Sequence, residues 1–439
     1  MKTQKLTGKD YLLSVQHLFA MFGATVLVPL LTGMNASLAL FTAGLGTLIF
    51  HVLTKFKVPV FLGSSFAFLP AIMAITLGEN GVIPSQVPVA QGGIIAAGAV
   101  YVIFAVIVFL VGTDKIKKLF PPVVTGPVII VIGIGLSSTA INDSLNNAYA
   151  GTLTGEVGAY IGIAVFTLAV VIGASIFAKG FFKLVPILIG IAAGYILCVI
   201  LKLTGAFDIV DFTAIKEAPW INIPFKSADA NGVAFMSLPK FELGAILSIA
   251  PVAIVTFMEH IGDITTNGMV VGKDFFSDPG LHRTLLGDGI ATGVAGFFGG
   301  PPNTTYSENT GVLATTKNYN PALLRVTAIF AIILGFVGKF GAVLQTIPSP
   351  VKGGVELVLF GMIAAIGIRT LAEAKLDFTH SRNLLIVALI LVLGLGLNAI
   401  GGLTLAVGTF SFNLSGLFVA VIIGVSANAV LPDEGKAKK

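Results

Sequence analysis

The most constraining feature of this sequence is a series of long apolar stretches, separated by short polar or Pro- and Gly-containing breaks. Only 11% of the 439 residues are charged, whereas soluble domains carry about 25%, so a soluble globular enzyme is excluded. Inside a bilayer only helices and closed barrels satisfy their backbone hydrogen bonds, and a helix crosses it with about 20 residues. Because the stretches are continuous and of that length, the sequence predicts an all-α integral membrane protein, with the lipid bilayer as a partner.

The apolar stretches predict fourteen membrane-spanning segments, at 11–32, 36–54, 58–77, 91–112, 120–140, 157–177, 181–204, 242–265, 282–298, 302–317, 321–346, 350–371, 382–400 and 413–431. With the N-terminus in the cytoplasm, all but six of the 26 Lys and Arg residues fall on cytoplasmic segments. This is the distribution that the positive-inside rule describes. We therefore predict a multi-pass protein of the cytoplasmic membrane with both termini in the cytoplasm.

The longest polar stretch, at 204–242, separates seven predicted segments from seven others that echo them. A Gln-His pair at 16–17 in the first segment corresponds to a Glu-His pair at 259–260 in the eighth, and 63–66 in the third corresponds to 303–306 in the tenth. An odd number of segments per half forces the second half to enter the membrane from the opposite side. The sequence thus predicts two inverted seven-segment repeats, an architecture of secondary transporters.

The third and tenth segments carry Pro, Gly and β-branched or hydroxyl residues, at 58–63 and 299–305, where a membrane helix should be unbroken. We expect each segment to begin extended and to become helical midway, so that each half-helix presents free N–H groups at its N-terminus. Matching breaks in the two halves of a transporter point to its binding site. The alternative is two proline-kinked helices packed within the bundle.

Acidic residues inside the predicted membrane region are the first candidates for function, because placing them there is unfavourable. Glu259 and Asp263 are four residues apart and so share one helix face, and Glu308 begins the helical half of the tenth segment. The alternative is a structural bond from each carboxylate to a hydroxyl or a backbone N–H. That alternative is strongest for Asp263, which lies nearer the cytoplasmic end.

Other polar residues in the segments are weaker candidates. His260 points about 100° away from the preceding glutamate, so we expect it to pack within the bundle. Gln16 and His17 are expected to cross-link helices near the site. Asp288 and Glu356 lie near the ends of predicted segments, where an interfacial or helix N-terminal charge is the favoured interpretation.

These groups suit one class of ligand. Carboxylates accept hydrogen bonds from ring N–H groups, and free backbone N–H groups donate to carbonyl oxygens. Phe66, beside the break of the third segment, either fills the core or stacks on a flat ring. A planar, neutral heterocycle with alternating N–H and C=O groups fits. Inorganic anions fit poorly, because no Lys or Arg accompanies the breaks.

The sequence offers little support for an enzyme or a channel. Five scattered His residues and a single Cys, Cys198, supply neither a nucleophile with its base nor a metal cluster. We therefore expect no enzymatic activity, no cofactor and no metal. A channel needs a continuous polar-lined pore, and the paired breaks favour a carrier instead.

Several motifs resemble one known family. The stretch ENTGVLATTK at 308–317 resembles the signature of the nucleobase-ascorbate transporter family, and the Gln-His pair at 16–17 matches its first-segment dipeptide. The stretches GSSFAF at 63–68, EHIGD at 259–263 and PNTTY at 302–306 resemble the bacterial uracil permeases of that family. The resemblance extends over nearly the whole chain.

The resemblance implies a fold of fourteen segments in two inverted repeats, divided into a core domain (11–112 and 242–346), a gate domain (120–204 and 350–431) and an extracellular loop (205–241). It also implies a homodimer that imports uracil with protons by alternating access, without nucleic acid as a partner. This is nucleobase transport by symport.

Two rival transporters remain open. A xanthine or uric acid permease would have the same fold, but Glu308 opens the signature where glutamine is expected in purine members, which favours a pyrimidine. A sulfate-like anion exchanger is disfavoured by the acidic site.

The resemblance also implies roles for individual residues. The substrate-binding set comprises Glu259 and Glu308 as hydrogen-bond acceptors, Phe66 and Ser307 through their backbone N–H groups, and Ala24 and Tyr306 as lining residues. The supporting set comprises Gln16, His17, His260 and Asn309.

Two positions depart from the pattern of uracil permeases. Asp263 stands where some of them have a proton-linked histidine, and Phe360 stands where a gate-domain tyrosine faces the site. Because two nearby carboxylates do not both ionise easily, we expect Asp263 to share proton coupling with Glu259.

Overall fold

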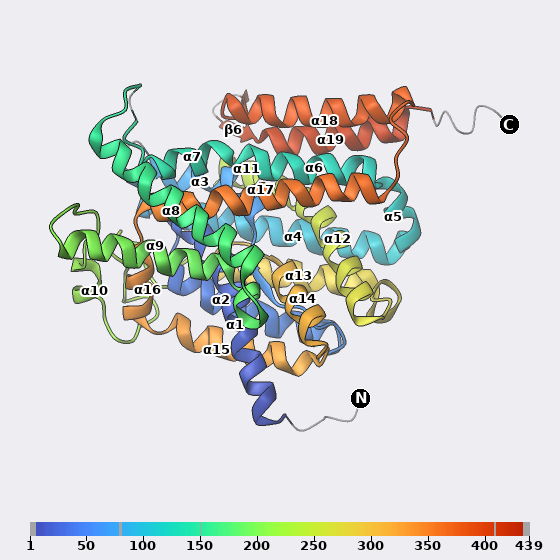
Figure 1. Cartoon of the computed structure of the whole chain (residues 1–439). Coiled ribbons are helices and arrows are strands. Elements are labelled where there is room, and N and C mark those ends of the chain that lie inside the picture. The colour runs from blue at the N-terminus through green and yellow to red at the C-terminus, as the bar shows by residue number, and fades with distance from the viewer. Residues whose placement is uncertain (1–5, 79–80, 150, 408–409, 433–439) are drawn as a thin grey trace.

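The computed structural model describes residues 6–78, 81–149, 151–407 and 410–432 of the chain. These residues form a bundle of helices with three short strand pairs (Figure 1). The predicted position of the two termini rests partly on lysines at 1–5 and 433–439, which lie outside the described residues. Residues 79–80, 150 and 408–409, within the predicted domains, lie outside them too.

The helices are α1 (Gly8–Thr32), α2 (Ala36–Leu53), α3 (Leu69–Thr76), α4 (Val87–Val111), α5 (Thr113–Leu119), α6 (Pro122–Gly135), α7 (Ser137–Ser144), α8 (Gly155–Phe177), α9 (Pro186–Leu203), α10 (Thr213–Glu217), α11 (Leu243–Ile249), α12 (Ala253–Val271), α13 (Leu281–Phe298), α14 (Ser307–Thr316), α15 (Pro321–Gly335), α16 (Gly338–Gln345), α17 (Ser349–Glu373), α18 (Ser381–Ala399) and α19 (Gly416–Val430). The strands are β1 (Leu62–Ser64), β2 (Leu77–Gly78), β3 (Gly81–Val82), β4 (Asn303–Thr305), β5 (Leu403–Val407) and β6 (Phe410–Leu414). Short helical turns are η1 (Phe66–Phe68), η2 (Pro84–Gln86), η3 (Gly180–Leu184), η4 (Ala250–Val252) and η5 (Phe276–Gly280).

Among the described residues, nine helices are long and apolar enough to cross a membrane. They are α1, α2, η2 with α4, α6 with α7, α8, α9, α11 through α12, α17 and α18. The other five predicted segments correspond to shorter or more polar elements: β1 with α3, α13, β4 with α14, α15 with α16, and α19. The prediction of a multi-pass, mostly helical membrane protein is thus confirmed. The count of fourteen crossings and their inverted symmetry stay predictions.

The third and tenth segments begin as strands and continue as helices. β1 pairs antiparallel with β4, with Gly63 opposite Thr304 at the centre. The helical parts follow at once, from Phe66 in η1 and from Ser307 in α14. The alternative of two continuous, proline-kinked helices is therefore wrong. Prolines lack the N–H that a helix needs. The backbone N–H and C=O groups of each extended stretch instead form hydrogen bonds with those of the other stretch.

The eleventh predicted segment is divided into two helices. The range 321–346 forms α15 and α16, which are separated at Phe336 and Val337. Here the polar 204–242 stretch adds backbone contacts: the N–H of Asn222 donates to Phe336 O at 2.8 Å and that of Gly338 to Trp220 O at 3.0 Å. The helix break was missed because its hydrogen-bond partners lie more than 100 residues away in the sequence.

The helices form two groups that pack mainly within themselves. One contains α1, α2, α4 and α13–α15, and the other contains α6–α9 and α17–α19. In Figure 1, α18 and α19 lie side by side at the edge of the second group, and α15 lies at the opposite edge of the molecule. This grouping has the form that a core and a gate domain would take; that the two groups move as domains stays a prediction.

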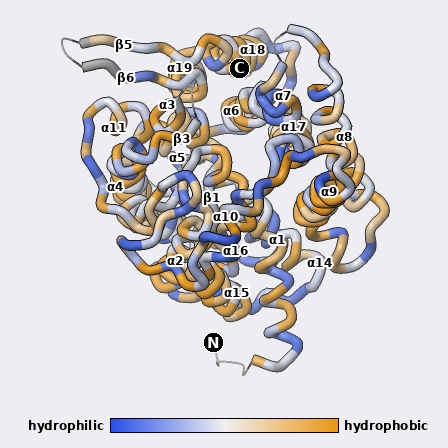
Figure 2. Tube along the Cα trace, turned by 90° about the vertical axis from the view of Figure 1, so that its left-hand side faces the viewer, coloured by the Kyte–Doolittle hydropathy of each residue, from blue (hydrophilic) through white to orange (hydrophobic). Residues whose placement is uncertain are grey.

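The outward faces of the helices are apolar. Figure 2 shows that hydrophobic residues predominate on helices such as α4 and α9. Large apolar side chains are exposed in rows on α4 and α8: Ile103, Val106, Phe109 and Leu110, and Val165, Ile172 and Ile176. Such rows are unfavourable in water but suit contact with lipid tails.

Candidate functional site

The two broken segments meet at the crossing of β1 and β4. Beyond the strand pair itself, the Ser65 N–H donates to Pro302 O at 2.9 Å, and the Tyr306 N–H donates to Phe61 O at 3.0 Å. The helices that follow start at Phe66 and Ser307, and neither N-terminus is capped by a side chain. The first N–H groups of these two helices therefore remain able to donate to a ligand.

Side chains from other helices hold this crossing in place. Thr47 of α2 accepts a hydrogen bond from the Leu62 N–H at 2.9 Å, and Thr292 of α13 accepts one from the Asn303 N–H at 3.2 Å. The amide of Asn267 on α12 donates to Pro59 O at 3.0 Å. Sequence reasoning missed these residues. A signal for Asn267 was present, because it follows Asp263 by four residues and extends the acidic face of α12.

Tyr306 joins the two segments through its side chain. Its hydroxyl donates to Ser64 O at 2.9 Å, and its buried ring lies against Gly63, where a Cβ atom would be only 2.3 Å from the ring. Ala24 of α1 is buried in the same apolar cluster, against which Phe66 packs. Both predicted lining residues thus lie at the crossing.

The three predicted acids gather beside the crossing. Asp263 of α12 accepts from the Ser307 hydroxyl at 2.6 Å and from the Thr305 hydroxyl at 3.0 Å. Glu259, one turn earlier, interacts electrostatically with Asp263 and Glu308, and its buried Oε2 has no hydrogen-bond partner among the described residues. No ion pair joins these acids to Lys or Arg in the part of the chain that the structure describes.

His260 and Asp288 form a separate, buried pair. The Nδ1 atom of His260 lies 2.8 Å from Asp288 Oδ2, and its Nε2 atom lies 2.9 Å from the Thr284 hydroxyl. His260 therefore packs α12 against α13. The expectation that Asp288 lies near a segment end is wrong: it is fully buried in the middle of α13, because His260 provides a partner there.

The two supporting residues of the first segment, Gln16 and His17, have different surroundings. The amide of buried Asn309 donates to His17 O at 3.0 Å and lies 3.2 Å from His17 Nδ1, which links α14 to α1. Gln16 is partly exposed and makes no hydrogen bond within the described residues. The expectation that it cross-links helices is therefore wrong, because its side chain turns away from the Asn309 contact that His17 makes.

Phe66 connects the site to the other group of helices. Its ring packs edge-on against Phe360 of α17, with 6.1 Å between the ring centres and an angle of 75°. Phe360 itself is buried. The side chain at this position of α17 therefore reaches the site as an apolar ring without a hydroxyl.

The site as a whole offers acceptors on one side and donors on the other. Carboxylates project from α12 and α14, and backbone N–H groups lie at two helix N-termini. Within the described residues, no group of three His, Cys, Asp or Glu side chains is placed to hold a metal ion. The arrangement suits a small, uncharged, planar molecule that both donates and accepts hydrogen bonds.

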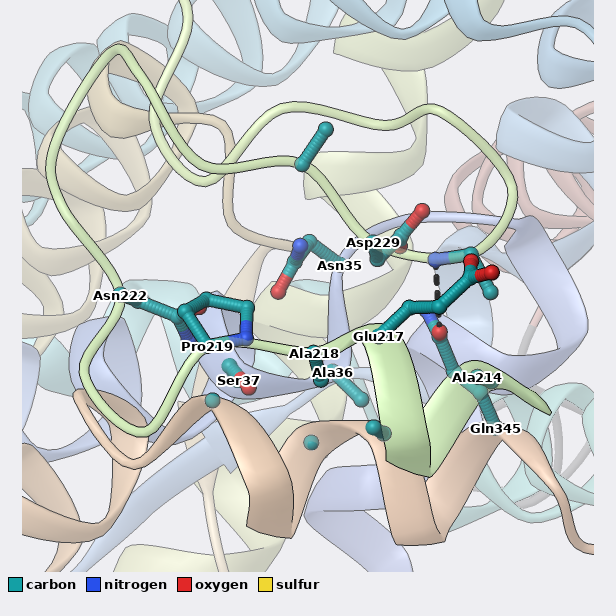
Figure 3. Close-up of a pocket in the computed structure, with 15 residues that line it drawn as sticks. Asn35, Ala36, Ser37, Ala214, Glu217, Ala218, Pro219, Asn222, Asp229 and Gln345 are labelled. Atoms are coloured by element: carbon teal, nitrogen blue, oxygen red, sulfur yellow. Dashed lines mark hydrogen bonds between the residues drawn. The ribbon is translucent and has the colours of Figure 1, made fainter. Parts of the chain in front are cut away.

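A cavity of about 150 Å³ lies elsewhere, between the 204–242 stretch and helices α2 and α16 (Figure 3). Its lining includes Asn35, Ser37, Asp229 and Gln345, and none of the predicted site residues. Burial raises the pKa of the Asp229 carboxyl to about 6, although its Oδ1 accepts two backbone N–H groups at 2.9 Å. This cavity is a feature of the polar stretch and not of the crossing.

Comparison with known proteins gives consistent results. Residues 8–403 match the model of the Permease family. The chain is 43% identical to a uracil permease of Bacillus caldolyticus, over 98% of this chain and 94% of that protein, and 42% identical to one of Bacillus subtilis (strain 168), over 95% and 92%. The transmembrane domain of a cyanobacterium bicarbonate transporter, BicA, is similar in fold, with a TM-score of 0.60 at 16% identity over 96% of this chain and 97% of that one.

The crossing should not tolerate a side chain at Gly63. In Gly63→Ala the new methyl group would displace the Tyr306 ring and break its bond to Ser64 O, so we expect a loss of about 1–3 kcal/mol of stability. Thermal unfolding of the purified protein in detergent measures it. Gly311→Ala on α14 is the control, since nothing lies within 4 Å of its added Cβ. Equal unfolding temperatures for the two variants would contradict the packing described.

Proposed function

The chain belongs to the Permease family, as a nucleobase-ascorbate transporter, and we propose that it imports uracil together with a proton across the cytoplasmic membrane. One observation carries the proposal: where β1 and β4 cross, carboxylates that have no Lys or Arg partner among the described residues lie beside two uncapped helix N-termini, and one of them, Glu259, has a buried oxygen without a donor. The relatives named above, which match nearly the whole chain, are uracil permeases.

Uracil has the hydrogen-bonding pattern that the crossing complements. Its ring N–H groups would donate to Glu259 and Glu308, and its carbonyl oxygens would accept from the backbone N–H groups of Phe66 and Ser307. The free Oε2 of Glu259 supports this role, because a buried acceptor without a donor is unfavourable until a ligand supplies one. Ala24 and Tyr306 would close the pocket around the ring.

The proton is assigned to the Glu259–Asp263 pair. Two ionised carboxylates on one helix face, without a basic partner, are unfavourable together, so the pair should hold one proton. Asp263 receives two hydroxyl donors, which favour its ionised form, and this supports assigning the proton to Glu259. Asp263 then acts as a fixed negative charge that favours the protonated form of Glu259. A proton entering from outside with uracil and leaving inside would drive accumulation.

Alternating access requires parts that move relative to each other. We assign α1–α4 and α11–α16 to a core domain and α6–α9 and α17–α19 to a gate domain, in two inverted repeats of seven segments. The packing of the helices in two groups supports this division, and the Phe66–Phe360 contact lies between them. A homodimer, as the family resemblance implies, would hold the gate domains still while the cores move.

The first prediction concerns substrate recognition. Glu308→Gln should weaken uracil binding by about 10- to 150-fold, because it removes a charge-assisted bond of about 1.5–3 kcal/mol. Titration of the purified protein with labelled uracil measures the affinity. The control is Glu242→Gln, which changes an exposed acid at the start of α11. Unchanged binding would refute the assignment. New uptake of xanthine by Glu308→Gln would favour the purine alternative.

The second prediction concerns proton coupling. Asp263→Asn keeps the size and an acceptor for the hydroxyls but removes the charge. We expect uracil binding and uracil exchange to survive, while accumulation driven by an imposed pH gradient falls to the level of equilibration. Reconstituted vesicles allow both measurements. If Asp263→Asn accumulated uracil as well as the parent at every external pH, coupling would belong to Glu259 alone.

The third prediction concerns orientation. Lys115 on α5 and Lys216 on α10 are exposed and lie at opposite ends of the bundle (Figure 1). In a Cys198→Ser background, a membrane-impermeant thiol reagent added to intact cells should label Lys216→Cys but not Lys115→Cys. Permeabilised cells provide the control, since both positions should then react. Labelling of position 115 alone from outside would mean that the topology is inverted.

A further inference from the structure

A second group of buried charges lies outside the substrate site, between α7 and α17. Glu356 of α17 is 0% exposed, and neither carboxylate oxygen has a hydrogen-bond partner among the described residues. Asp143 of α7 is 8% exposed, and its Oδ2 likewise lacks a hydrogen bond in the described part of the chain. The ammonium group of Lys352, one turn before Glu356, lies 3.6 Å from that oxygen. The expectation of an interfacial charge at Glu356 is therefore wrong.

Small residues on α17 explain the burial. A Cβ atom on Gly353 would lie 2.3 Å from the Ser144 backbone N, and one on Gly354 would lie 2.4 Å from Ala164 O. These two glycines let α7 and α8 approach the N-terminal part of α17 closely. The approach covers Glu356 and brings Asp143 against it.

The charges of this cluster do not balance. Two carboxylates face one ammonium group, and Asp143 and Lys352 are the charged groups that interact with Glu356. α6, also packed on α17, carries no titratable side chain in its sequence. Fully ionised, the cluster would hold one uncompensated negative charge in a dry environment, which is strongly unfavourable.

The titratable groups on α8 and α9, which also pack against α17, are engaged elsewhere. On α8, the exposed Glu156 accepts from the Tyr160 hydroxyl at 2.5 Å. On α9, Lys202 pairs with Asp208 at 2.6 Å, and the Tyr195 hydroxyl lies 2.7 Å from that of Thr346. Cys198 is buried among apolar side chains. None of them supplies the missing positive charge.

We propose that Glu356 and Asp143 bind one proton between them and form a second proton site, separate from Glu259 and Asp263. With one carboxyl protonated, it can donate to the other carboxylate, and Lys352 neutralises the charge that remains. All three groups are then satisfied, and the net charge is zero.

This proton site is connected to the substrate site along a single helix. Phe360 follows Glu356 by four residues, so both lie on one face of α17, and Phe360 packs on Phe66 at the break of the third segment. Loss of the proton would leave a charge that draws Glu356 out of its packing against α7. That movement shifts the part of α17 that touches Phe66, so it weakens the closed arrangement around uracil. Only this last consequence rests on the proposed transport of uracil.

The proton itself can be observed without substrate. Infrared difference spectra of the purified protein in lipid, recorded between neutral and alkaline pH, should show loss of a protonated carboxyl band. Glu356→Gln, which keeps the side-chain volume, should remove one such band, and Asp143→Asn should remove or shift the same one. Glu373→Gln, an exposed acid on the same helix that pairs with Arg369, is the matched control and should leave the band in place.

Two results would overturn the site. One is a spectrum of folded Glu356→Gln that matches the parent at every pH, which would mean that both carboxylates are ionised. The other is loss of the band on adding Na⁺ at constant pH, which would make this a metal-cation site. A Glu356→Gln protein that fails to fold leaves Asp143→Asn to decide between these outcomes.

Uracil binding then tests the connection to the substrate site. Glutamine at 356 mimics the protonated group, so from neutral to alkaline pH Glu356→Gln should lose affinity only through Glu259. Its loss should be about 5- to 150-fold smaller than that of the parent, the range of ordinary coupling between sites. Equal loss in both proteins would disprove the connection while leaving the proton site intact. Absence of uracil binding by the parent at any pH would count against the proposed function and not against the proton site.

Discussion

The structure depends on how two interrupted segments satisfy their backbone groups away from water. An extended stretch inside a bilayer must find hydrogen-bond partners within the protein. β1 and β4 find them in each other, and the carbonyl of Pro59 and the N–H of Leu62 find them in Asn267 and Thr47. This pairing fixes both segments at the same depth, so two helix N-termini start from one place.

The acids of α12 are positioned by the same crossing. The hydroxyls of Thr305 and Ser307, the last residue of β4 and the first of α14, both donate to Asp263. Glu259, one turn away, is left with an oxygen that has no donor among the described residues. Asp263 and Glu259 therefore differ in their hydrogen-bond donors although they share one helix face. The transition from β4 to α14 supplies hydroxyl donors to Asp263 and none to Glu259.

Buried acids in this protein follow two patterns. Asp288 is bonded to His260, and this contact packs α12 on α13. Glu259 with Asp263, and Glu356 with Asp143, lack enough positive charge nearby. Glu356 lies one turn before Phe360, whose ring meets that of Phe66 between the two groups of helices. Neutral α17 and α12 surfaces permit close packing, whereas charged ones favour water, so in the transport cycle that we propose, proton occupancy and helix arrangement would be linked through desolvation.

The sequence by itself determined the membrane class, most helix positions and the two broken segments, because apolar run length and misplaced Pro and Gly are local signals. It also singled out Glu259, Asp263 and Glu308 as candidate site residues, since acids are rare in apolar segments. Only the tertiary structure decided that β1 pairs with β4, that Asp288 and Glu356 are buried, and that α15 ends at Gly335. Each of these depends on a partner far away in the sequence: Thr304 for Gly63, His260 for Asp288, Asp143 for Glu356 and the Trp220 region for the α15–α16 break. Local patterns give the length and polarity of a segment, but whether a polar group is satisfied depends on which distant group folds against it.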